Sequence, residues 1–424
     1  MAVGGAGNEG GRQSGGCRAG SLPGVPTTID VAAERAATPG CATVAHLNAA
    51  GAALPTVATV ATVVAHLELE AAVGGYEAAA AVADRTAGVA ASVAALLGAR
   101  PDEVALTVSD TDGWTKALWG LALGGGLPAG ARVLVDRQSY DSHYLGLLQA
   151  CRTTGASIDV VPATADGTID LEALDAELAR GDVSLVSATH VGTHRGLVNP
   201  VEAVGARCRA AGVLFFLDAC QSVGQLPVDV GRIGCSVATA TGRRWLRGPR
   251  GTGLLYVAAG LADTLVPPGL DGTSATWEDA DGYALAPGVS RFTPFETPVA
   301  LHLGLGTAVD HARQLGIDAI AAAVGRIAEH LRGELASVAG VAVHDGGARR
   351  SGIVTFTVEG VDPLTVKGAA SAAGVNVSVT QAAAAHFDMG GDRPDAVVRA
   401  SPHYVTTEEE CARLVEVAAG LAPH

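Results

Sequence analysis

The strongest constraint on the fold is a repeated alternation of short apolar runs with segments of helical periodicity, from about residue 103 to residue 258. A clear helical segment is 200-PVEAVGARCRAAG-212, which follows one apolar run and precedes the next. Alternation of this kind indicates a mostly parallel, doubly wound α/β sheet with helices on its faces. The expected strands are 103–109, 131–136, 157–163, 183–191, 212–219, 236–242 and 253–258.

The segments before this alternation differ from it in composition. Residues 1–42 are rich in Gly, Ser, Pro and Arg without a period, so we expect a flexible N-terminal tail. An Ala-rich stretch over about 56–98 predicts helices, with a turn near Gly74.

A second, smaller domain is expected after the alternation. Residues 297–340 have the pattern of long helices, and 351–360 and 374–380 have the pattern of strands. The sequence therefore predicts a large domain over 43–290 and a small α+β domain over 291–424.

Composition excludes several classes of partner. Hydrophobic residues make up 48% and charged residues 17% of the 424 residues, which is typical of a globular protein. A formal net charge of -15 argues against binding to nucleic acid or to an anionic membrane. No run of eighteen apolar residues and no secretory signal is visible, so we expect neither a membrane span nor export. Seven scattered cysteines without a CxxC pair predict a reduced, cytoplasmic protein without a metal site.

Two segments place polar residues where strands end and helices begin. Asp218 ends an apolar run, which places it at the edge of an open α/β sheet where ligands bind. The alternative is that Asp218 caps the next helix. In 107-TVSDTDGWTKALWGLAL-123, Ser109 and Thr111 could seat a phosphate at a helix N-terminus, or Ser109 could be an ordinary N-cap. We expect Lys116, in the second turn, to be a surface or structural residue.

A third segment, 241-TGRRWLRGPRGTG-253, combines a hydroxyl group, glycines and four arginines after an expected strand. Arginine clusters and glycine turns suit an oxyanion such as phosphate. The alternative is a solvated basic loop, which Trp245 and Pro249 make less natural.

These segments resemble the class V aminotransferase and cysteine desulfurase family of fold type I, which uses pyridoxal phosphate (PLP). Among its members the chain is most like the ergothioneine-type carbon–sulfur lyases and the isopenicillin N epimerase-like proteins. The resemblance extends from about Leu47 to the end of the chain. The matching motifs are 45-AHLNAAG-51, 188-ATHVGTHRGLVNP-200, 217-LDACQSVGQLPVDV-230, 241-TGRRWLRGPRGTGLLYV-257 and 398-VRASPHYVTTEEE-410.

The resemblance implies a role for each matching residue. Asp218 would pair with the pyridine nitrogen, Gln221 and Thr193 would reach the ring hydroxyl, and Tyr140 would stack on the ring. Arg399 would bind the α-carboxylate of the substrate. The residues at the phosphate-binding positions are Ser109, Asp110, Thr111, Thr241 and Arg243.

The chain departs from the family pattern at its chemical centre. Arg244 stands where the family has the lysine that forms the Schiff base, and a guanidinium cannot replace that amine. His194, Ser236 and Thr406 also replace residues that are usual in the lyase branch. Residues 380–396 contain no cysteine of the kind that desulfurases use, so we set that activity aside.

Three functions remain open on these grounds. The first is a PLP enzyme that binds its cofactor non-covalently and acts at the α or β carbon of an amino acid or its S-conjugate, with His194 as the candidate base. The second is a PLP-independent tailoring enzyme whose arginines bind an anionic small molecule. The third is a non-catalytic paralogue. By analogy with the family, we expect a homodimer.

Overall fold

The computed structural model describes residue 1, residues 28–389 and residues 393–423. Its centre is a seven-stranded sheet in the order β2-β8-β7-β6-β5-β3-β4, in which β8 runs antiparallel to both neighbours and the other pairs are parallel. All seven predicted strands are confirmed. They are β2 (Val104–Thr107), β3 (Arg132–Val135), β4 (Ser157–Val160), β5 (Val183–Thr189), β6 (Leu214–Asp218), β7 (Val237–Thr241) and β8 (Gly253–Val257).

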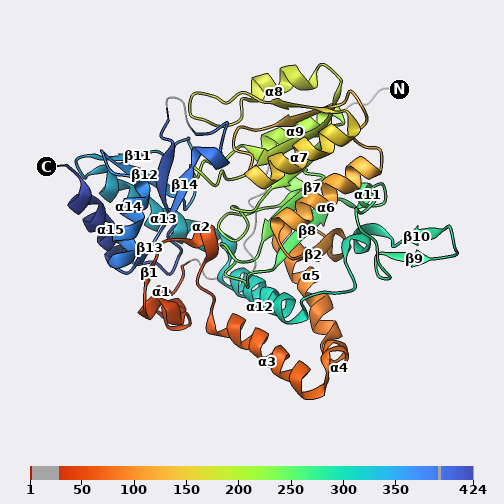
Figure 1. Ribbon diagram of the computed structural model, residues 1–424, viewed down its shortest axis with the longest axis horizontal. Helices are drawn as coiled ribbons and strands as arrows, with labels where there is room; N and C mark the ends of the chain where they lie inside the picture. The colour runs from red at the N-terminus through yellow and green to blue at the C-terminus, as the bar shows by residue number, and fades with distance from the viewer. Residues whose placement is uncertain (2–27, 390–392, 424) are drawn as a thin grey trace.

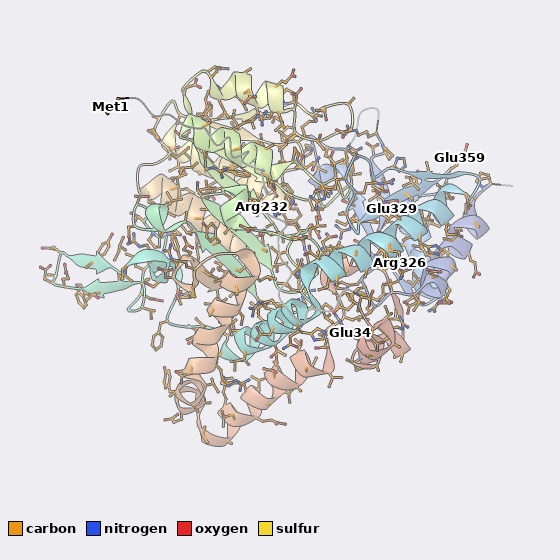
Figure 2. All side chains as sticks on the ribbon, turned by 180° about the vertical axis from the view of Figure 1, so that it is seen from behind. Met1, Glu34, Arg232, Arg326, Glu329 and Glu359 are labelled. Atoms are coloured by element: carbon orange, nitrogen blue, oxygen red, sulfur yellow. The ribbon has the colours of Figure 1, made fainter. Side chains whose placement is uncertain are left out.

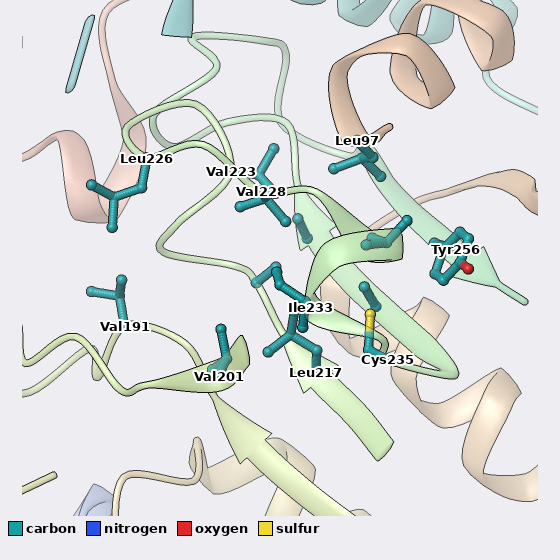
Figure 3. Close-up of a cluster of buried hydrophobic side chains, with 14 of the residues drawn as sticks. Leu97, Val191, Val201, Leu217, Val223, Leu226, Val228, Ile233, Cys235 and Tyr256 are labelled. Carbon is teal, nitrogen blue, oxygen red and sulfur yellow. The ribbon is translucent and has the colours of Figure 1, made fainter. Parts of the chain in front are cut away.

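The sheet is buried on both faces. Successive residues of β6 show this directly, because Phe215 and Leu217 belong to one hydrophobic core and Phe216 to the other. Figure 3 shows part of the first core, with Leu217 near Val201 and Ile233. The helices between the strands are α6 (Asp110–Leu123), α7 (Asp141–Thr154), α8 (Leu171–Leu178), α9 (Val201–Ala211), α10 (Val230–Ile233) and α11 (Ala259–Ala262).

The C-terminal part forms a second layer of structure beside the large sheet (Figure 1). Its antiparallel sheet has the order β11-β12-β15-β14 and is packed against helices. Helix α13 lies along the face turned toward the viewer in Figure 2, where Arg326 and Glu329 are labelled. Helix α12 (Val299–Leu315) belongs to the core of the large sheet, to which its Leu305 and Val309 contribute. The elements of the C-terminal part are α13 (Ile317–Ala336), β11 (Val341–Val343), β12 (Val354–Val358), α14 (Pro363–Ala372), β13 (Val375–Asn376), β14 (Ser378–Gln381), β15 (Ala396–Ala400) and α15 (Glu408–Leu421).

The prediction of a flexible tail over residues 1–42 is wrong for residues 31–42. Helix α1 (Val31–Ala36) and the 3-10 turn Pro39–Ala42 are ordered, and residues 2–27 lie outside the described residues. Arg35 holds α1 in place, because its guanidinium donates to the Glu410 carboxylate at 3.0 Å and to the Val405 carbonyl. No apolar periodicity marks this segment, and an ion pair between residues far apart in the chain stabilises it.

Two further features were not expected. Strand β1 (Ala45–His46) pairs in parallel with β13, so residues placed in the large domain pack with the C-terminal part. The strands β9 (Ala275–Trp277) and β10 (Tyr283–Leu285) form a hairpin that projects from the body (Figure 1). Trp277 on this hairpin is 81% exposed, so the hairpin lacks the apolar burial from which a strand is recognised.

The Ala-rich N-terminal stretch forms α2 (Ala49–Ala52), α3 (Val57–Val73), α4 (Gly75–Ala81) and α5 (Ala83–Leu97), with the predicted turn at Gly74. By length and composition alone, Ala49–Val73 could cross a membrane, with a mean hydropathy of 1.6 and 22% of the apolar window buried. Contrary to the expectation from the sequence, one stretch therefore passes this test. Helix α3 nevertheless packs along α12, and its buried His66 contacts Glu70 at 3.0 Å. The absence of a membrane partner therefore remains a prediction.

Close packing of α9 on α10 requires a glycine at position 205. A Cβ atom there would lie 1.9 Å from the Ile233 carbonyl oxygen. We expect Gly205→Ala to lower the free energy of unfolding by about 1–3 kcal/mol, as overpacking does. The matched control is Gly325→Ala on α13, where no atom lies within 4 Å of the added methyl and a gain of about 0.5–1 kcal/mol is expected. Urea denaturation measures both, and equal effects would contradict this packing.

Candidate active site

The predicted site residues converge at the carboxyl edge of the large sheet. The neighbouring strands β6 and β7 end there at Asp218 and Thr241. Helices α6 and α7 begin at the same edge, at Asp110 and Asp141. In open α/β sheets this edge is where ligands bind, so the topology alone brings these groups together.

The centre of the site is a histidine between two carboxylates. His143, in the first turn of α7, places Nε2 2.8 Å from Asp110 Oδ2 and Nδ1 3.5 Å from Asp218 Oδ2. Its ring stacks on Trp114, with centroids 4.2 Å apart and planes inclined by 17°. All three polar side chains are buried. A neutral imidazole would turn a lone pair toward one carboxylate, so this geometry favours the imidazolium.

The pKa values of the three groups follow from this arrangement. Burial opposes the charge of His143, but the carboxylates of Asp110 and Asp218 raise its pKa above the ordinary value. Burial acts to raise the pKa of Asp110, yet contact with His143 lowers it. Burial and the neighbouring Asp110 raise the pKa of Asp218 to about 6. At neutral pH the two carboxylates therefore share one imidazolium.

Arg244 is a buried cation without a hydrogen-bonding partner at its Nε. Its side chain is 7% exposed, and no described residue accepts a hydrogen bond from Nε. The guanidinium carbon lies 5.9 Å from the centre of the Tyr140 ring. Burial opposes its charge, whereas the nearby Cys220, Asp110 and Asp218 raise its pKa. Arg244 therefore keeps an Nε donor that no described residue accepts.

The other arginines of this loop have different roles. Arg247 has a positive φ of 63° and is held by hydrogen bonds from its guanidinium to Leu54 O and Tyr404 Oη, at 2.8 and 2.6 Å. Arg243 donates to Gly51 O at 2.8 Å, which joins the loop to α2. Arg250 is exposed. The interpretation of all four arginines as one oxyanion site is therefore wrong, and only Arg243 and Arg244 remain candidates.

Arg399, Thr193 and Gln221 form one hydrogen-bonded group. Arg399 Nη1 donates to Thr193 O and Oγ1 at 3.1 and 3.0 Å, while its buried Nε has no partner among the described residues. Gln221 Nε2 donates to Thr193 Oγ1 at 2.6 Å and Gln221 Oε1 accepts from Trp245 Nε1 at 2.9 Å. Burial and the charge of Arg244 lower the pKa of Arg399 to about 10. An anion would relieve this repulsion.

The hydroxyl groups predicted to bind phosphate all have protein partners. Ser109 Oγ accepts from Asp112 N at 3.0 Å, so Ser109 is the N-cap of α6. Thr111 Oγ1 shares a hydrogen bond with Ser142 Oγ, and Thr241 Oγ1 donates to Thr252 O at 3.1 Å. Among the described residues, the backbone amides of Asp110 and Thr111 have no hydrogen-bond acceptor and remain available to an anion. Lys116 pairs with Asp112 at 3.0 Å, as a structural residue would.

His194 lies close enough to Arg399 for the charge of the guanidinium to act on its ring. Its Nδ1 shares a hydrogen bond with Thr380 Oγ1, and its Nε2 is buried without a partner among the described residues. Burial and the charge of Arg399 lower the pKa of His194 to about 4, so the ring is neutral at physiological pH. The other two departures from the family pattern act locally, because Ser236 Oγ accepts from Phe215 N and Thr406 Oγ1 accepts from His403 N.

Sequence reasoning missed His143, Trp114 and Cys220. The spacing of Tyr140 and His143 would have placed both at the start of one helix, but the contact of His143 with Asp218 depends on the order of the strands. Asp110, Asp218 and Cys220 also hold potential metal ligands within 4.8 Å of one another. Their negative charge is already offset by His143 and Arg244, so a metal-free site stays a prediction.

Comparison with known proteins agrees with this architecture. The sequence profile described as aminotransferase class-V matches residues 44–414. The chain belongs to the class-V aminotransferase family. This is a PLP-dependent family of fold type I that includes cysteine desulfurases and acts on amino acids such as cysteine.

Two curated relatives align with similar shares of the chain. A cysteine desulfurase of Enterobacter sp. is 30% identical over 336 residues, which cover 78% of this chain and 81% of the relative. A probable cysteine desulfurase of Methanothermobacter thermautotrophicus is 29% identical over 327 residues, which cover 76% and 80%.

Solved structures show the same fold. The cysteine desulfurase CsdA of Escherichia coli has a TM-score of 0.86 at 20% identity, covering 93% of this chain and 100% of its own. The cystine C-S lyase C-DES, solved with its product cysteine persulfide, has a TM-score of 0.81 at 22% identity, covering 91% and 100%.

The raised pKa of His143 leads to a prediction about how stability depends on pH. Its pKa is raised on folding, so its contribution is fully present below the unfolded pKa and is lost as pH rises through the folded pKa. We expect His143→Gln to lower the free energy of unfolding by about 2–4 kcal/mol at neutral pH, because two buried carboxylates lose their cation, and by less at alkaline pH. Denaturation across the pH range measures this difference.

The matched control is His302→Gln on α12. His302 is also buried, but burial lowers its pKa to about 4, so its loss should not change with pH between neutral and alkaline values. A His143 ring that titrates below its ordinary pKa by NMR would contradict the account.

Proposed function

We propose that the chain is a PLP-family lyase that acts on a cysteine-type amino acid or its S-conjugate and binds its cofactor without a covalent bond to the protein. The observation that carries this proposal is the position of Asp218. Its carboxylate ends β6 at the ligand-binding edge, where it is buried and flanked by His143 and by Asp110 at the N-terminus of α6. Membership of the class-V aminotransferase family supports the choice of cofactor, and Arg244 in the TGRRWLRGPRGTG motif supports binding without a covalent bond.

The residues present fit the cofactor in its charged parts. Asp218 would hold the ring nitrogen, and Tyr140 would lie against the ring. The amides of Asp110 and Thr111 with Arg243 would hold the phosphate. When bound, PLP supplies an electron sink that stabilises negative charge at the amino-acid α carbon. The unpaired Nε atoms of Arg244 and Arg399 show that the pocket has donors left for an anion.

The chain's own residues limit the chemistry. Arg399 would grip the α-carboxylate of the substrate, with Thr193 fixing the orientation of its guanidinium. His194 Nε2 would accept a proton, but a pKa of about 4 makes it a weak base at neutral pH, so slow turnover is expected. Elimination at the β carbon, including carbon–sulfur cleavage, and epimerisation both begin with removal of the α proton by such a base.

One related structure supports binding without the lysine. A C-DES variant in which a lysine is replaced by alanine was solved with glycine covalently linked to its PLP cofactor. That protein has 22% identity to this chain and a TM-score of 0.81. The same fold can therefore hold PLP when that lysine is absent.

A second candidate function is a PLP-independent enzyme or a non-catalytic paralogue that binds an anionic small molecule. Contact between His143 and Asp218 favours it, because Asp218 already has a cationic partner within the protein. Cofactor stoichiometry separates the two candidates.

Variants of Asp218 and Arg244 test the first candidate. Arg244→Lys should give a PLP adduct that borohydride fixes and intact mass detects, because a lysine amine can condense with an aldehyde. Asp218→Ala should weaken PLP binding at least about tenfold, through loss of a charge-assisted hydrogen bond. The matched control is Asp229→Ala at the N-cap of α10, away from the site. Unchanged PLP affinity in Asp218→Ala would count against the proposal.

We also propose that the protein is a homodimer. Helix α3 carries four exposed apolar residues at intervals of three and four, which lie on one face of the helix. They are Val57, Val60, Val64 and Leu67, between 45% and 51% exposed. Nothing in the described chain covers them, and a second copy would remove them from water.

Light scattering coupled to size-exclusion chromatography checks this prediction. We expect a dimer for the wild-type chain and a shift toward monomer for the double variant Val60→Glu, Leu67→Glu. The control is Leu364→Glu on α14, an exposed leucine outside this face. A wild-type monomer would exclude the homodimer.

A further inference from the structure

The charges of the side chains around Asp218 do not sum to zero. Two carboxylates, Asp110 and Asp218, face His143 and three arginines. The arginines are Arg243, Arg244 and Arg399. Within the described residues, the site therefore carries an excess of positive charge.

This excess lies on Arg244 and Arg399. Both side chains are more than nine-tenths buried, and each has an Nε atom without a partner among the described residues. Among the described residues neither guanidinium forms an ion pair with a carboxylate, although Asp110 and Asp218 lie close enough to raise the pKa of Arg244. Leaving buried donors unpaired is costly, so the arrangement points to a ligand that supplies the acceptors.

We propose that Arg244 binds a second acidic group of the substrate, so that the preferred substrate is a dicarboxylic amino acid, such as a cysteine conjugate with a carboxylate on its sulfur substituent. This inference rests on the proposed function for the placement of the α-carboxylate on Arg399. One anionic group then pairs with each buried guanidinium. A single carboxylate would leave one of them unpaired.

The planar fork of a guanidinium suits this task. It can donate two parallel hydrogen bonds to one carboxylate, and it remains charged in a buried site. Tyr140 lies against Arg244 and limits its orientations, since the guanidinium carbon is 5.9 Å from the ring centre. Replacement of a lysine by arginine at this position thus exchanges a covalent anchor for an anion-binding group.

Calorimetric titration of the PLP-loaded protein tests the inference. The probes are S-carboxymethyl-L-cysteine and S-ethyl-L-cysteine, which differ mainly in the second carboxylate. We expect the diacid to bind at least about tenfold more tightly, as for a buried charge-assisted pair. Arg244→Met should remove this preference. Arg326→Met, at an exposed arginine on α13 that pairs with Glu408, should keep it (Figure 2).

The same titration without cofactor separates this inference from the proposed function. Succinate and butyrate replace the amino acids, and melting temperatures establish that each variant is folded. If PLP does not bind but succinate binds more tightly than butyrate in an Arg244-dependent manner, the proposed function fails and the assignment of Arg244 to a second acidic group stands. Equal affinity for diacid and monoacid, or a preference that survives Arg244→Met, overturns it.

Discussion

The contact of His143 with two buried carboxylates decides what the rest of the site can do. Two carboxylates buried side by side repel each other, and burial alone would protonate one of them. An imidazolium between them, held flat against Trp114, keeps both charged and fixes the direction of Asp218. Asp218 therefore has a cationic partner within the protein before any ligand binds.

Arg244 adds a cation near both carboxylates, and Arg399 adds a second cation near Arg244. Each guanidinium is buried and keeps an Nε donor that no described residue accepts. The strongest unmet interaction at this site is therefore with a negatively charged group.

Much of the architecture could be predicted from the sequence, because the apolar runs of six of the seven strands are buried on both faces and each strand is followed by a recognisable helix or turn. Asp218 was placed at the correct edge for the same reason. His143, the ordering of α1 by Arg35 and the separate role of Arg247 could not be predicted. Each depends on a contact between residues far apart in the chain, which local patterns do not encode.

The most direct measurement is a titration of the purified wild-type protein with PLP, followed by absorbance and by intact mass with and without borohydride. The account predicts saturable binding near one PLP per chain with no borohydride-fixed adduct, since Asp218 and the arginines hold the cofactor and no lysine stands at position 244. A fixed adduct on the wild-type chain, or the absence of saturable binding, would contradict it.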